Sequence, residues 1–209
     1  MGRPKTITDD ALLLIAREVF VRDGASGSTA EIAARAGVSE ATIFKRFTTK
    51  AALFVAAMAP PQVDAAAIIA GAEAAPDAHE AIIHIGERVL AHFRAALPVA
   101  MPLISNPLIG VEGLRRHFGR SAAEVLVEAI AGYLQRQADR GRVSRCDPRT
   151  MAMTLVACTH TIAQFEVMGM HGDPMPAAGV RALLDVLWDG LRPGGAERDI
   201  RIIEGNPGR

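Results

Sequence analysis

Apolar residues recur at every third or fourth position along most of the chain, which is the period of an α-helix. The clearest stripe covers residues 121–140 and is followed by Gly141, a residue typical of the position just past a helix. Residues 148–168 are apolar on more than one face, which predicts a helix buried on two sides. No strand-like alternation interrupts these segments. The sequence therefore predicts an all-α protein.

Capping residues and prolines divide this pattern into separate helices. Thr8 precedes two acidic residues and predicts a helix start, and Asp23-Gly24 predicts the end of that helix. Pro60-Pro61 should stop or kink a helix that begins at Thr48 or Thr49. Further helices are expected over 63–75, 78–97, 121–140, 148–168 and 176–191. The prolines in 98–107 predict only short helical turns there.

Residues 28–47 contain two short helical patterns joined by a glycine. Ser28 or Thr29 caps the first pattern and Ser39 caps the second, while Gly37 permits the tight turn between them. Ala33 is small where the two helices would cross. An ordinary helical hairpin is the competing interpretation, but the caps and the small crossing residue together favour a helix-turn-helix.

The second of these helices has a distinct outward face. Ile43 and Phe47 are expected to point inward, which leaves a compact face able to enter a DNA major groove. The outward residues are Glu40, Ala41, Thr42, Phe44 and Lys45.

Charge is balanced over the whole chain but not along it. The chain has 23 Lys and Arg against 23 Asp and Glu, whereas residues 1–58 hold eight basic against six acidic residues. All three lysines lie in that first part, which is where phosphate contacts are expected. Arg3 and Lys5 precede the first helix and are candidates for a minor-groove arm, with an unbound tail as the alternative.

The stretch from residue 8 to residue 58 resembles the tetracycline-repressor (TetR) family of bacterial transcription regulators. The matching residues include Gly24, Thr29, the run IAARAGVS, the run IFKRF, Lys50 and Leu53. The resemblance implies an all-helical homodimer that binds a palindromic operator, usually as a repressor, and is released by a small molecule. It also implies that Thr29, Ser39 and Lys50 hold phosphates, while Glu40, Ala41, Thr42 and Lys45 face base edges.

The chain departs from the family pattern at two places. The family commonly has Tyr-x-His-Phe where this chain has Phe44-Lys45-Arg46-Phe47, so Arg46 is expected to replace part of the phosphate contact of the missing tyrosine hydroxyl. Pro60-Pro61 interrupts a connecting helix that the family usually keeps continuous.

Three regions are expected from these patterns: a DNA-binding domain over 1–58, a helical ligand-binding and dimerisation domain over 59–192, and a loose Gly-rich tail over 193–209. The second domain should enclose a mostly apolar pocket between 78–97, 98–107, 121–140 and 148–168. Its expected lining is His92, Phe93, Met101, Phe118, Met153, His160, Gln164 and Phe165, although a plain Met-filled core fits the same pattern. The expected dimer interface is Leu155, Val180, Leu184, Leu187 and Trp188.

Other functional classes have little support in the sequence. The six histidines form no metal-ligand spacing, no nucleophile or phosphate-binding motif is present, and Cys146 and Cys158 have no metal-type spacing. The sequence therefore predicts neither an enzyme nor a cofactor or metal site. The longest uncharged run, 95–111, is too short and too rich in proline to span a membrane, so a cytoplasmic protein is expected. The partners expected are operator DNA, a second copy of the chain and an effector of unknown identity; the alternative is a dimeric regulator that answers to no ligand.

Overall fold

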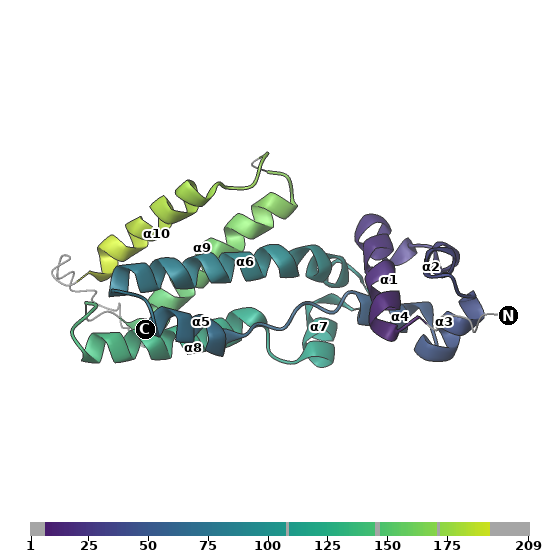
Figure 1. The fold of residues 1–209 in the computed structure, drawn as a ribbon, viewed down its shortest axis with the longest axis horizontal. Coiled ribbons are helices and arrows are strands. Elements are labelled where there is room, and N and C mark those ends of the chain that lie inside the picture. The colour runs from purple at the N-terminus through teal and green to yellow at the C-terminus, as the bar shows by residue number, and fades with distance from the viewer. Residues whose placement is uncertain (1–6, 108, 145–146, 171, 193–209) are drawn as a thin grey trace, which may run out of the picture.

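The computed structural model describes residues 7–107, 109–144, 147–170 and 172–192. The described chain is helical and elongated, with a small group of helices at one end and a larger bundle at the other (Figure 1). The elements are α1 (Asp9–Asp23), η1 (Gly24–Ser26), α2 (Thr29–Ala36), α3 (Glu40–Phe47), α4 (Lys50–Ala57), α5 (Ala65–Glu73), α6 (Ala78–Ile104), α7 (Gly110–Phe118), α8 (Ala122–Asp139), α9 (Pro148–Val167) and α10 (Ala177–Leu191). The all-α prediction is confirmed.

The predicted helix starts coincide with side-chain caps. The Thr8 hydroxyl accepts a hydrogen bond from the Ala11 N–H at 3.2 Å, and Ser28, Ser39 and Thr49 cap α2, α3 and α4 in the same way. These bonds satisfy backbone donors that a helix start otherwise leaves without partners. Of the alternatives open in the sequence, Ser28 rather than Thr29 and Thr49 rather than Thr48 are the caps.

The small group consists of α1 to α4 around its own core. Leu12, Phe20, Ile43 and Phe54 are at most 2% exposed. The rings of Phe20 and Phe54 meet edge to face, with centroids 5.1 Å apart, a favoured aromatic geometry. Ile43 brings the inner face of α3 into this core, which fixes the orientation of α3.

Helix α6 contradicts the expectation for residues 98–107. It continues through Pro98 and Pro102 to Ile104, so one helix replaces the predicted helix plus isolated turns. Each proline lacks an N–H, so the carbonyls of Arg94 and Pro98 lose their usual helical donors. Burial of Val99 and Leu103, which are 5% and 0% exposed, compensates for these lost hydrogen bonds.

The far end of α6 also packs against the small group of helices. Val99 and Leu103 belong to the same apolar cluster as Leu12 and Phe54, and Leu114 and Phe118 of α7 pack against that cluster. Helix α7 was absent from the sequence prediction, since Pro107 and several glycines obscure its period. The proline-containing end of α6 is therefore the structural support of the N-terminal helices.

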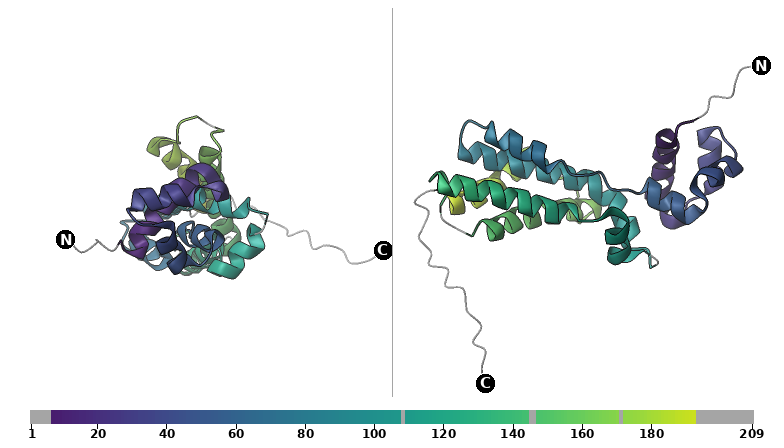
Figure 2. Two further views of the ribbon diagram at one scale, coloured as in Figure 1. Left: turned by 90° about the vertical axis from the view of Figure 1, so that its right-hand side faces the viewer. Right: turned by 90° about the horizontal axis from the view of Figure 1, so that it is seen from below.

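The larger bundle is formed by α5, α6, α8, α9 and α10 (Figures 1 and 2). Helix α9 contacts both α6 and α8, which confirms its predicted burial on two sides, and α10 packs against α6. Pro60-Pro61 lies in the non-helical connection between α4 and α5, as expected. No described helix combines the length and apolar character needed to cross a membrane.

Candidate nucleic-acid interface

The turn between α2 and α3 depends on one glycine in a left-handed conformation. Gly37 has φ 66° and ψ 31°, which side chains with a Cβ rarely adopt. The N–H of Val38 donates to the Ala33 carbonyl at 3.0 Å, closing the end of α2. Ala33 is 5% exposed, in agreement with its predicted place at the helix crossing. The chain can then reverse and start α3 within three residues.

Helix α3 presents a solvent-facing surface at the end of the molecule away from the bundle (Figures 1 and 2). Ile43 is fully buried, whereas Glu40, Ala41 and Lys45 are exposed. Thr42 and Phe44 are half-buried. This arrangement agrees with the division into inner and outer faces expected from the sequence.

The polar groups around the start of α3 are hydrogen-bonded to one another. The Thr29 hydroxyl donates to Glu40 Oε1 at 2.5 Å, which links the first residue of α2 to the first residue of α3. Ser39 Oγ accepts from the Thr42 N–H at 3.2 Å and lies 2.9 Å from the Thr42 hydroxyl. The carboxylate of Glu40 is therefore held in place before any DNA arrives.

Two cations expected to contact phosphates already have protein partners. Arg46 donates to the Ile7 carbonyl at 2.9 Å and to Asp9 Oδ1 at 3.0 Å. Lys50 Nζ donates to the Ser26 carbonyl at 3.0 Å. Arg46 therefore ties the start of α1 to α3 in this conformation, and its expected phosphate contact stays a prediction.

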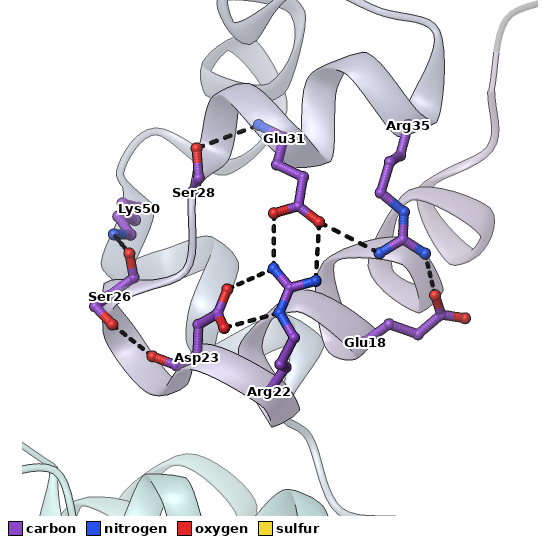
Figure 3. Close-up of polar contacts among 8 residues, drawn as sticks. All are labelled: Glu18, Arg22, Asp23, Ser26, Ser28, Glu31, Arg35 and Lys50. Carbon is purple, nitrogen blue, oxygen red and sulfur yellow. Dashed lines mark hydrogen bonds and ion pairs between the residues drawn. The ribbon is translucent and has the colours of Figure 1, made fainter.

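Arg22 lies at the centre of an ion-pair network between α1 and α2 (Figure 3). Its guanidinium bonds Asp23 at 2.6 and 2.8 Å and Glu31 at 2.7 and 3.2 Å. Arg35 pairs with Glu18 and lies 3.8 Å from Glu31. Hydrogen bonds from Arg22 lower the pKa of both Asp23 and Glu31, so these carboxylates stay ionised around neutral pH.

Lys45 differs from every other cation in residues 7–58. Within the part of the chain that the structure describes, Arg17, Arg22, Arg35, Arg46 and Lys50 each donate to a protein oxygen, and Lys45 has no such partner. It is exposed and lies on the outer face of α3. Lys45 was one of several candidate cations in the sequence, which gave no signal for this distinction because most partners of the others, such as Ala57 for Arg17 and Ser26 for Lys50, are distant in sequence. Arg3 and Lys5 lie outside the described residues.

The residues expected to line a ligand pocket do not come together in either of the two cavities described below. Phe93 is 4% exposed and its ring meets those of His92 and His160, with centroids 5.6 and 4.9 Å away. Burial lowers the pKa of both histidines. Met101, Gln164 and Phe165 are half-buried. Two expectations need correction: Met153 is 54% exposed, and Phe118 packs against the N-terminal core.

Two cavities of the described structure are lined mainly by other residues. One of about 610 Å³ lies at the end of the bundle remote from α3, beside Tyr133, Gln137 and Trp188. Another, of about 430 Å³, lies between α5 and α6 and includes His92. Among the described residues no cluster of three or more His, Cys, Asp or Glu side chains is arranged to hold a metal ion.

Three of the five residues expected at the dimer interface lie elsewhere, whereas the assignment of Leu187 and Trp188 stays a prediction. Leu155, Val180 and Leu184 are at most 4% exposed and belong to the core of their own chain. Leu187 and Trp188 are half-buried against the same core. Periodicity identified these positions as apolar but could not separate contacts within the chain from contacts with a second copy.

Comparisons with known proteins agree with this geometry. The family model described as "Bacterial regulatory proteins, tetR family" matches residues 12–57. A search of curated proteins finds no match.

Several solved structures share the fold over most of the chain. NalD of Pseudomonas aeruginosa, the secondary repressor of the MexAB-OprM multidrug efflux pump, is 18% identical, with a TM-score of 0.61 over 90% of this chain and 96% of NalD. A putative TetR-family regulator from Mesorhizobium loti is 21% identical, with a TM-score of 0.64 over 89% and 100% of the two chains. The regulator CifR, as a cysteine mutant bound to a 26-base-pair operator, is 18% identical, with a TM-score of 0.59 over 90% and 98%.

The fold and the exposed α3 face define a helix-turn-helix DNA-binding protein of the class that regulates transcription. Residues 12–57 match the TetR family of bacterial regulators, and solved TetR-family regulators share the fold of the chain.

Proposed function

We propose that the protein is a homodimeric repressor that binds a palindromic operator through α3 and leaves it when a small, mostly apolar ligand binds the helical bundle. The observation that carries the DNA-binding part is Lys45, the exposed cation of α3 without a partner among the described residues. The other charged groups around α1 and α2 largely neutralise one another, which leaves Lys45 available for DNA.

In this proposal the α3 surface reads bases while its flanks hold phosphates. Lys45 reaches guanine or phosphate oxygens, and the Glu40 carboxylate accepts from a cytosine amino group. Ala41 and Thr42 offer methyl groups for thymine contacts. The starts of α2, α3 and α4 lie next to this surface, and phosphates are held there by the Thr29 backbone N–H, the Ser39 hydroxyl and the Lys50 ammonium group.

Exposed apolar side chains support self-association through the last two helices. Of the eight large apolar residues exposed in the described chain, five lie on α9, on α10 or between them: Met153, Val167, Met168, Met170 and Val186. Such a concentration is typical of a covered surface. A two-fold axis would place the two α3 helices about 34–36 Å apart, or a multiple, to match successive major grooves.

The contact between α6 and the N-terminal core supports a ligand response. Because Val99 and Leu103 pack beside Leu12 and Phe54, a shift of α6 in the bundle would move the DNA-binding helices with it. A ligand that binds one arrangement of the dimer more tightly would change operator affinity by that difference. NalD is a repressor, and CifR has been solved bound to operator DNA. Both proteins share this fold, so they support this type of activity by analogy.

Selection of bound duplexes from a random DNA pool tests the proposal. We expect a palindromic consensus, binding that weakens steeply with salt, and a loss of enrichment for Lys45→Ala. Arg149→Ala is the matched control, because it removes an exposed cation at the start of α9, remote from α3. Recovery of no consensus would contradict the proposal. A consensus that no bound ligand weakens would instead favour the ligand-independent regulator.

A further inference from the structure

The groove between α5 and α6 has two chemically different walls. Figure 1 shows α5 lying alongside the first half of α6, after the connection that comes from α4. The groove has a volume of about 430 Å³, within the range of small-molecule sites. Its lining is Val63, Asp64, Ala67, Ile68, His84, Arg88, Ala91 and His92.

The α6 wall presents three nitrogen-bearing side chains in one row. His84, Arg88 and His92 are four residues apart, so each lies about one helical turn from the next, with neighbouring Cβ atoms roughly 5–6 Å apart. Arg88 is exposed and makes no hydrogen bond or ion pair with a described residue. A guanidinium without a protein partner at the edge of a groove is suited to a carboxylate.

His92 leaves a polar atom unsatisfied at the same wall. Its Nε2 is buried and has no hydrogen-bond partner in the described structure. Buried polar atoms normally have partners, and an exception calls for an explanation such as a ligand or water. Because His92 lines the groove, a turn of its ring would bring Nε2 to the hydroxyl or carbonyl group of a ligand beside Arg88, which would provide the missing bond.

The α5 wall is largely apolar and carries one carboxylate, Asp64, at the helix start, where the positive end of the helix dipole offsets part of its charge. Val63, Ala67 and Ile68 supply aliphatic surface. The Asp64 carboxylate is committed to the helix start, since its Oδ1 accepts from the Ala67 N–H at 2.8 Å.

A glycine in α5 lets the His84 ring lie against that helix. A Cβ added at Gly71 would fall 2.3 Å from His84 Nε2, so a larger residue would displace the ring. Glycine inside a helix lowers its stability by about 1 kcal/mol relative to alanine, so a packing reason for this residue is expected. The close approach sets the end of the groove at His84.

We propose that this groove binds small organic acids, with the carboxylate on Arg88, a hydroxyl or carbonyl group on His92 Nε2, and an apolar body against Val63, Ala67 and Ile68. A compact aromatic acid such as 4-hydroxybenzoate carries a carboxylate, a hydroxyl group and an apolar ring in one rigid molecule. The role of this groove as the effector site of the regulator rests on the function proposed above. Binding of the acid itself does not depend on DNA.

The groove lies where binding would affect the connection between the two groups of helices. Val63 and Asp64 precede α5 directly, and the chain between Met58 and Asp64 links α4 to α5. An acid held against Ala67 and Arg88 would fix the start of α5 relative to α6. The position of the link to α4 would then differ between the bound and the free protein.

Titration calorimetry on the full-length protein tests the site directly. The probes are 4-hydroxybenzoate, benzoate and hexanoate, each compared with its neutral amide, and inorganic phosphate. We expect the acids to bind, the amides to bind at least about tenfold more weakly, and phosphate to bind poorly because it lacks an apolar body. Absence of acid binding at millimolar concentration overturns the proposal.

Four variants locate the binding. Arg88→Gln should weaken every acid by roughly tenfold or more, whereas Arg149→Gln removes an exposed cation elsewhere and should change nothing. His92→Phe keeps the ring and should weaken 4-hydroxybenzoate more than benzoate. Ala67→Leu should block all three acids by filling the groove while keeping a good helix former. Unchanged acid binding in Arg88→Gln, with its helical circular dichroism intact, contradicts the site.

An operator assay separates this proposal from the proposed function. Acids that bind in the groove and weaken operator binding support both. Acids that bind in the groove without changing operator affinity support the site and contradict ligand-induced release. Operator binding together with no acid binding overturns the groove and leaves the DNA-binding function in place.

Discussion

The Arg17 guanidinium of α1 donates from Nε to the carbonyl oxygen of Ala57, the last residue of α4, at 2.7 Å. Nη2 of the same side chain donates to the Ala59 carbonyl at 3.2 Å. A helix leaves its last carbonyls without internal partners, and a cation there also interacts favourably with the helix dipole. Arg17 therefore fixes the point at which α4 ends and the connection to α5 begins.

Replacing Arg17 should destabilise the junction between α4 and the connection to α5. Arg17→Met keeps the aliphatic stem but removes both donors, so we expect the free energy of unfolding to fall by about 1–3 kcal/mol. Urea denaturation followed by circular dichroism measures the change. Arg120→Met is the control, because Arg120 is exposed and pairs only with Glu128, and its stability should stay unchanged. Equal effects of the two substitutions would contradict the role of Arg17.

Lys45 and Arg46 are neighbours in sequence but should have opposite phenotypes. Lys45→Ala removes an exposed cation without a described partner, so we expect operator binding to weaken by about 1–3 kcal/mol with unchanged stability. Arg46→Ala breaks the bonds to Ile7 and Asp9, so we expect a lower unfolding temperature. Fluorescence anisotropy with operator DNA and thermal denaturation measure the two effects. The assignment of α3 is wrong if Lys45→Ala binds the operator normally.

Glu40 should contribute to base preference. Its carboxylate is held by the Thr29 hydroxyl at 2.5 Å and can accept from cytosine. Glu40→Gln removes a negative charge near phosphates and adds an amide suited to adenine, so non-specific affinity should rise and the consensus should change. Repeating the DNA selection with this variant checks both outcomes. Thr29→Val tests the hydrogen bond that holds Glu40: loss of the hydroxyl should weaken the preference for cytosine without replacing it by another base. An unaltered consensus in both variants would argue against base contact by Glu40.

Stability should fall as the pH drops below about 6.5. Burial lowers the pKa of His92 and His160 below the ordinary value of 6.5, so the folded state favours their neutral forms. The unfolded chain takes up protons first, and the stabilisation present above pH 6.5 is lost as the pH decreases toward the folded pKa values. Urea denaturation between about pH 5 and 7.5 measures this loss. The double variant His92→Phe, His160→Phe should show a flatter profile, and an equally steep one would place the pH dependence elsewhere.

The sequence was sufficient to predict the helices of the N-terminal DNA-binding region, because their determinants are local. Caps such as Ser39, the turn at Gly37 and the inward Ile43 all act within a few residues of one another. The hydrogen bonds between distant residues of that region were not predictable in the same way. Arg17 meets Ala57 forty residues later, and Arg46 meets Ile7, so no periodic pattern contains these contacts.

The bundle was predicted less well because competing tertiary contacts decide its details. Pro98 and Pro102 were expected to end α6, but burial of Val99 and Leu103 against the N-terminal core favours its continuation. Leu155 and Leu184 were assigned to an interface between copies, yet both fill the core of their own chain. Apolar periodicity identifies a buried face but not the element that covers it.

The packing of α10 on α6 depends on the absence of a side chain at Gly86. A Cβ added there would lie 2.3 Å from Leu184 Cδ2 and 2.6 Å from Cδ1, and Leu184 is fully buried. Gly86→Ala gains up to about 1 kcal/mol of helix propensity. The overlap costs about 1–3 kcal/mol, so we expect a net loss of stability.

Two further substitutions separate the steric overlap with Leu184 from the gain in helix propensity. Gly132→Ala in α8 meets only Arg136 Nη1, at 3.6 Å, and should stabilise the protein. In a Leu184→Ala background the new methyl group at position 86 would enter the cavity left by the leucine, so Gly86→Ala should change sign and become stabilising. Urea denaturation of the four proteins of this double-mutant cycle, with Gly132→Ala alongside, measures the coupling. Additive effects of Gly86→Ala and Leu184→Ala would show that the two residues are not in contact, and would place α10 elsewhere on α6.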